Sequence, residues 1–124
     1  MSDRGSATIV ALAISSLLVL VAAGLVGVGR LVSAHVQATA AADAAALAAA
    51  PVTFLGGDPP AEAADYARAN GARLVTCSCP LNRTFDLRVV TVEVVRDVDL
   101  GPLGTHNVRA RAAAEFAPLD LLGG

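Results

Sequence analysis

The sequence predicts an α+β fold: a long N-terminal transmembrane helix that continues into an alanine-rich helix, then a short helix and a three-stranded antiparallel sheet. Three observations predict it. Residues 7–29 are apolar and carry no charge, residues 30–50 are nearly all good helix formers, and apolar residues alternate with a period of two after Gly71. We expect five segments: 1–6, 7–29, 30–50, 51–60 and 61–124.

The composition narrows the class of protein before any motif is considered. Of 124 residues, 55% are hydrophobic but only 3% aromatic, and 16% are charged, against roughly 25% charged in an ordinary soluble domain. The net charge is −2 and every basic side chain is arginine. No stretch is basic enough to follow a phosphate backbone, so we expect no nucleic-acid partner. The length allows one small domain, so we expect no enzyme.

Residues 7–29 form the predicted membrane span, preceded by a short N-terminal tail at residues 1–6. As a helix, such a run measures about 35 Å against a hydrocarbon core of roughly 30 Å. Because a foldable domain follows, we expect the N-terminus in the cytoplasm and the C-terminal domain outside, with membrane lipid as a partner. The alternative is a secretory signal cut near the small residues Ala22, Ala23 and Gly24.

The alanine-rich extension covers residues 30–50 and ends before Pro51. His35, Thr39 and Asp43 recur every four residues and predict a polar stripe facing solvent or a partner. The alanines gather on another side of the helix, where small side chains allow close packing. We expect residues 51–60 to form a loop, because this segment is rich in proline and glycine.

The remaining segment, residues 61–124, predicts a small α+β domain. A short helix runs from Pro60 to Asn70, with Asp58 near its N-cap. Strands are expected at 73–79, 84–98 and 106–116, with a bulge or bend near Val89–Val90. Short connections favour an antiparallel meander, and the alanine-rich helix is the natural cover for its apolar face.

Three stretches resemble a known family. They are Asp3–Thr8 directly before the apolar run, the alanine-rich Val36–Ala50, and Tyr66–Ala72 followed by Cys77. They resemble the small TadE/TadG-like membrane proteins of tight-adherence (Flp) pilus assembly, which are type IV pilin-like, and in particular those of actinobacterial type. The resemblance implies a pilin-like fold and an accessory role in pilus or secretion assembly. It also implies that the partners are other pilin-like or assembly-complex membrane proteins.

The resemblance further implies a candidate cut by prepilin peptidase after Gly5, which would leave Ser6 as the new N-terminus. Major pilins carry glutamate five residues beyond the cut, where this chain has Val10. We therefore expect a single-pass accessory protein retained in the cytoplasmic (inner) membrane. The alternative is a small secreted binding or redox module released by signal peptidase.

The sequence offers no catalytic, cofactor-binding or metal-ligating set, and we expect no small-molecule substrate. Cys77 and Cys79 are the most reactive feature. In a flat strand these positions share a face, with Cα atoms about 6.6 Å apart, near the outer limit for a disulfide. Two buried thiols and a strained, reducible bridge are equally supported, and an intermolecular bond comes third. A catalytic thiol protein is a further hypothesis, although no base lies nearby in sequence.

Overall fold

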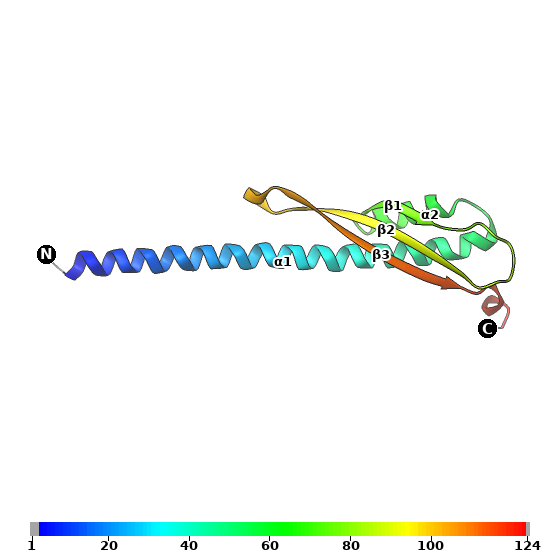
Figure 1. The fold of residues 1–124 in the computed structure, drawn as a ribbon, viewed down its shortest axis with the longest axis horizontal. Helices are drawn as coiled ribbons and strands as arrows, with labels where there is room; N and C mark the ends of the chain where they lie inside the picture. Colours follow the sequence, from blue (N-terminus) through cyan, green and yellow to red (C-terminus); the bar gives the residue numbers. More distant parts are fainter. Residues whose placement is uncertain (1–2, 124) are drawn as a thin grey trace.

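A computed structural model describes residues 3–123 and shows the predicted α+β architecture (Figure 1). One long helix projects at its N-terminal end, and all other elements lie along its C-terminal part. The short helix and the three-stranded antiparallel sheet confirm the expected fold class. In chain order the elements are α1 (Asp3–Leu55), α2 (Pro59–Ala69), β1 (Arg73–Ser78), β2 (Arg88–Asp99), the 3-10 turn η1 (Gly101–Leu103), β3 (Thr105–Phe116) and the 3-10 turn η2 (Pro118–Leu121).

Helix α1 is longer than expected at both ends, because it already includes residues 3–6 and continues past Pro51. At 1.5 Å per residue it measures about 80 Å. The loop expected at residues 51–60 is therefore wrong in its first half, and only residues 56–58 separate α1 from α2. Gly56 and Gly57 make this turn with φ of 87° and 139°, values that side chains disfavour.

Contacts around the last turn explain why α1 remains helical beyond Pro51. The Thr53 hydroxyl donates to the Ala50 carbonyl at 2.6 Å. The Thr53 carbonyl accepts from the Asn82 N–H at 3.0 Å and from Arg88 Nη1 at 3.3 Å. A cation at the C-terminal end of a helix is also favoured by the helix dipole. These contacts give hydrogen-bond donors to carbonyl groups in the last turn of α1 and compensate for the hydrogen bond that Pro51 cannot donate.

Arg88 also holds the loop before β2 in place. Its guanidinium donates to the carbonyls of Asn82 and Thr84 and lies 5.9 Å from the centroid of the Phe54 ring. The strand expected from residue 84 therefore begins at Arg88. Phe54 and Phe85 pack nearby, with ring centroids 5.3 Å apart. This contact gives the end of the domain far from the projecting helix an aromatic cluster.

The sheet has strand order β1-β2-β3. Strands β2 and β3 pair in unbroken register from Arg88↔Phe116 to Asp99↔Thr105. The bulge expected near Val89–Val90 is wrong, since Leu87 precedes the strand and does not enter its alternation. The irregularity lies in β1 instead, between Leu74 and Thr76.

Alanines of α1 form one wall of the core, as predicted, and valines of β2 form the other. Val90, Val92 and Val94 are completely buried. Because an alanine projects only a methyl group, the helix can approach the sheet and α2 closely. The alanines of α1 in this core cluster are Ala38, Ala41, Ala42, Ala45, Ala46, Ala49 and Ala50.

Helix α2 closes the domain and has the predicted cap. The Ala61 N–H donates to Asp58 Oδ1 at 3.1 Å, which satisfies a free donor of the first turn. The chain leaves the helix through Gly71, where φ is +77° and the carbonyl accepts from Arg96 Nη1 at 2.8 Å.

Candidate membrane and assembly surfaces

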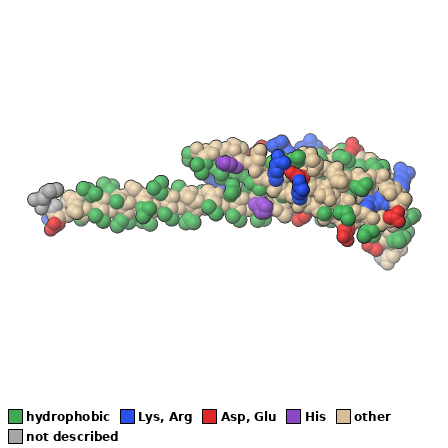
Figure 2. All heavy atoms as spheres, viewed as in Figure 1, with side chains coloured by type: hydrophobic (Ala, Val, Ile, Leu, Met, Phe, Trp, Pro, Cys, Tyr) green, Lys and Arg blue, Asp and Glu red, His purple; other side chains and the backbone are tan. Residues whose placement is uncertain are grey.

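The N-terminal part of α1, residues 3–33, is here called the projecting segment; it extends beyond the rest of the domain, whose β2–β3 hairpin ends beside residues 23–30. All its side chains are exposed except at Gly27, which is half-buried. The segment holds the one helix stretch in residues 3–123 that is long and apolar enough to cross a membrane. Figure 2 shows hydrophobic side chains along its whole visible length. This surface suits lipid or another apolar helix, but not water.

Polar groups inside the projecting segment are satisfied within the helix. The hydroxyls of Thr8, Ser15 and Ser16 donate to carbonyls one turn earlier, at 2.9, 2.8 and 2.8 Å. A lipid environment demands this, because hydrocarbon offers no hydrogen-bond partner. The three hydroxyls therefore do not argue against membrane insertion.

The β2–β3 hairpin reaches back along α1 to the end of the apolar run. Leu100–Leu103, at the hairpin end, line a shallow groove together with Ala23, Gly24, Val26, Gly27 and Arg30. No sequence motif predicts this contact, but the length of the strands indicates it. Strands of 12 residues span about 40 Å, whereas the alanine face of residues 34–50 spans about 25 Å. The hairpin must therefore extend beyond that face.

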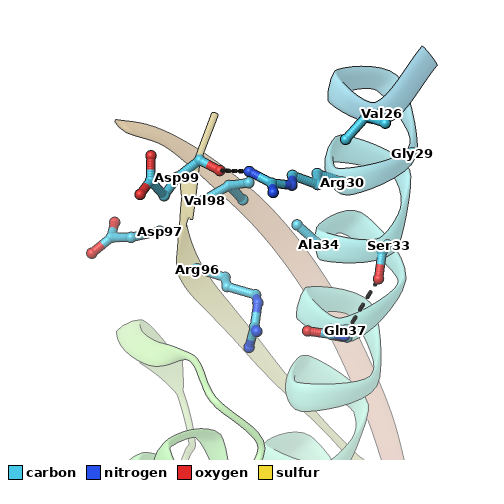
Figure 3. Close-up of a pocket in the computed structure, with 10 residues that line it drawn as sticks. All are labelled: Val26, Gly29, Arg30, Ser33, Ala34, Gln37, Arg96, Asp97, Val98 and Asp99. Atoms are coloured by element: carbon cyan, nitrogen blue, oxygen red, sulfur yellow. Dashed lines mark hydrogen bonds between the residues drawn. The ribbon is translucent and has the colours of Figure 1, made fainter. Parts of the chain in front are cut away.

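A second groove of about 520 Å³ lies between α1 and β2, next to the first. Figure 3 shows its lining from both elements, with Arg30 pointing from the helix toward the strand. Arg30 Nη1 donates to the Asp99 carbonyl at 3.4 Å, and Gln37 Nε2 donates to Ser33 Oγ at 3.4 Å. The groove is open and carries two arginines and two aspartates.

The sheet face turned away from α1 carries an ion-pair cluster. Glu93 accepts from Arg109 Nη1 at 3.0 Å and from Arg111 Nε at 2.7 Å. The two arginines cover the carboxylate, whose side chain is only 10% exposed. The hydrogen bond from Arg111, and then that from Arg109, lowers the pKa of Glu93 below its usual value. The arginines themselves stay exposed, so their guanidinium groups are accessible on this face.

The candidate processing site lies at the start of α1. Gly5 and Ser6 are exposed in its first turns, and Val10 is exposed one turn further on. These residues therefore lie on the surface of a helix rather than in an extended tail.

The cysteines lie at the end of β1 and are paired with each other as a disulfide. Their Cα atoms are 5.4 Å apart, closer than in a flat strand, because β1 ends at Ser78. Both side chains are half-buried and pack against the core cluster.

The polar stripe of α1 does not form a ligand site. His35 and Asp43 are both exposed, and the Thr39 hydroxyl donates to the His35 carbonyl at 2.9 Å. Within residues 3–123, no group of three or more His, Cys, Asp or Glu side chains is placed to hold a metal ion.

Comparison with known families agrees with the sequence motifs. The Tad family model, described as Flp pilus-assembly TadE/G-like, matches residues 5–52. This segment covers the apolar run and all of the alanine face, whereas the Tyr66–Ala72 motif lies outside it and remains a resemblance. Comparisons with curated proteins and with solved structures give no match. Residues 5–52 are therefore similar to the TadE/G-like family of Flp pilus assembly.

Proposed function

We propose that the protein is a non-catalytic, single-pass accessory protein of Flp pilus assembly, held in the cytoplasmic membrane by residues 7–29. The observation that carries the proposal is that this uncharged run is exposed at every residue except the half-buried Gly27, yet belongs to the same continuous helix as the domain core. An exposed apolar surface of this size needs a partner. Lipid covers most of it, and other assembly proteins contact the rest.

The cysteine pair supports an extracytoplasmic domain. Disulfides persist in oxidising compartments and are rare in the cytosol. Cys77 and Cys79 are the only cysteines of the chain, and they are bonded to each other. The short N-terminus before the run then lies in the cytoplasm, because the helix crosses the membrane once.

An accessory role fits the start of the helix better than a role as the major filament subunit. Val10 stands where a major pilin has glutamate, and the only charges before the run are Asp3 and Arg4. No carboxylate is therefore available within the run to pair with a neighbouring subunit. The partners we propose are pilin-like and assembly-complex membrane proteins, which contact the projecting segment and the arginine-bearing sheet face.

The native cysteines provide the test of orientation. Intact cells are treated with a membrane-impermeant maleimide, with and without prior treatment by a membrane-impermeant phosphine reductant. We expect labelling of Cys77 and Cys79 only after reduction, because both are bonded and outside. Labelling that requires cell lysis would place the domain in the cytoplasm and contradict the proposal.

The mature N-terminus separates the proposal from a secreted module. Mass spectrometry of the purified protein should find Met1, or Ser6 if the peptidase cuts after Gly5. The secreted alternative rests on the domain core, which begins only at Ala34 and so does not include the apolar run. An N-terminus near Leu25, with protein in the medium, would establish that alternative instead.

A further inference from the structure

The end of the β2–β3 hairpin, residues 100–104, is an uncharged turn between charged strands. Its sequence is Leu-Gly-Pro-Leu-Gly, with Asp99 before it and Thr105 and His106 after it. The Leu103 side chain is 74% exposed. A single exposed leucine is ordinary on a protein surface, so the position of this turn is what requires an explanation.

The turn lies beside the last part of the apolar run. It forms a groove with residues Ala23–Arg30 of α1, and Figure 1 shows the hairpin end above the middle of that helix. Ala23 is six residues before Gly29, or about 9 Å along the helix axis. The run measures about 35 Å and the hydrocarbon core roughly 30 Å. With the run centred in the bilayer, the helix residues that line this groove extend from just outside the hydrocarbon boundary to about 6 Å below it, and the turn lies beside them.

Most backbone donors of the turn are paired within the hairpin. The Leu100 N–H donates to the Gly104 carbonyl and the Gly104 N–H to the Gly101 carbonyl, both at 2.9 Å. The Gly101 N–H donates to Asp99 Oδ1 at 2.8 Å, and Pro102 has no N–H to satisfy. Four of the five residues thus present no unpaired donor, which lowers the cost of leaving water.

The charges near the turn lie where headgroups would be. Arg30 directly follows the run and reaches the Asp99 carbonyl at 3.4 Å. Its long side chain can extend toward phosphates while the turn stays among acyl chains. Further from the membrane, the hairpin becomes polar, with Asp97 paired to Arg73 at 3.4 Å. The order from apolar turn to arginine to ion pair matches the order of layers in a bilayer.

We propose that residues 100–104 are a second membrane anchor, which inserts Leu103 into the extracytoplasmic leaflet beside α1. The inference rests on the proposed membrane span of residues 7–29. Its occupant is lipid, because the groove continues directly from the lipid-covered surface of the run. Two attachment points would fix the height of the domain and stop it from rotating about α1.

Tryptophan substitutions test the anchor, because the chain has no tryptophan of its own. Three exposed leucines serve as single reporters: Leu103→Trp at the hairpin end, Leu18→Trp in the run, and Leu119→Trp in η2 at the far end of the domain. Their exposed fractions are 74%, 64% and 59%. Each full-length variant is placed in phosphatidylcholine–phosphatidylglycerol vesicles with lipids brominated at shallow or deep acyl positions.

We expect deep bromines to quench Leu18→Trp, shallow bromines to quench Leu103→Trp at least twofold, and neither to quench Leu119→Trp. If Leu18→Trp is quenched and Leu103→Trp behaves like Leu119→Trp, the anchor is refuted while the span stands. If Leu18→Trp is not quenched, the span itself fails. Emission of Leu103→Trp that shifts with protein-to-lipid ratio, without quenching, would assign the turn to a second copy and refute the lipid anchor.

A second measurement excludes the possibility that indole itself draws the turn into lipid. Hydrogen exchange of the turn in vesicles is compared between the unmodified chain, Leu103→Asp and the control Leu119→Asp. We expect the backbone amide at position 103 to exchange at least tenfold faster in Leu103→Asp than in the other two proteins, because a carboxylate cannot enter hydrocarbon. Equal exchange in all three proteins would overturn the anchor.

Discussion

Enlarging one alanine of the core measures how closely α1 packs against its neighbours. Ala42 has no exposed surface and belongs to the cluster that contains Val90, Val92 and Val94. Ala42→Leu adds three carbon atoms to a site with no room. Overpacking of this kind costs about 1–3 kcal/mol. For a domain of this size, a loss of about 2 kcal/mol lowers the melting temperature by roughly 8–16 °C.

Ala40→Leu is the matched control, since Ala40 is exposed on the same helix two residues away. Leucine and alanine differ little in helix propensity, so the control should stay within about 0.5 kcal/mol of the unmodified protein. Thermal unfolding is measured in detergent, with amide exchange in β2 as the probe, because the membrane segment stays helical there. If the two variants have the same stability, the close packing of the alanine face is refuted.

Three further substitutions test other parts of the domain. Glu93→Gln should weaken the dependence of stability on pH in the acid range. The pKa of Glu93 is lower in the folded state than in the unfolded state, so its carboxylate stabilises the fold at pH values above the unfolded-state pKa. This stability is lost as the pH falls through the folded-state pKa. Chemical denaturation between pH 3 and 7 measures this, and an unchanged acid limb would show that the arginine pair is inert. Arg88→Met should cost about 2 kcal/mol, since it removes the side-chain donor to the Asn82 and Thr84 carbonyls and one of the two donors to the Thr53 carbonyl. Arg83→Met, at an exposed arginine, is its control, and equal melting temperatures would contradict the role of Arg88. Gly71→Ala should cost about 1–2 kcal/mol, because φ is +77° and the new methyl group would meet Arg96 Nη1. A melting temperature of Gly71→Ala no lower than that of the unmodified protein would show that position 71 does not require glycine.

Patterns that depend on one segment at a time could be predicted from the sequence. The run at 7–29 needs only length and lack of charge, and the valines of β2 need only a period of two. The N-cap at Asp58 needs only its neighbours. Each of these features depends only on nearby residues, so the local sequence is enough to predict it.

Features that depend on contacts between distant segments could not be predicted in this way. Proline normally ends a helix, but Asn82 and Arg88 bond to the Thr53 carbonyl and keep α1 helical past Pro51. The irregularity in β1 arises from pairing with β2, which no single strand encodes. The groove at the hairpin end required a comparison of strand length with helix length, and residues 100–104 alone carry no recognisable motif.

The continuity of α1 has a mechanical consequence. No break separates the apolar run from the domain core, so in the proposed membrane arrangement the helix acts as a lever with its pivot at the membrane surface. Residues 30–55 extend about 39 Å beyond Gly29, and a tilt of about 10° would move their far end sideways by about 7 Å. Helix tilts of this size accompany ordinary differences in bilayer thickness. The position of the domain above the membrane is thus coupled to the bilayer and to any neighbour that pushes on the helix.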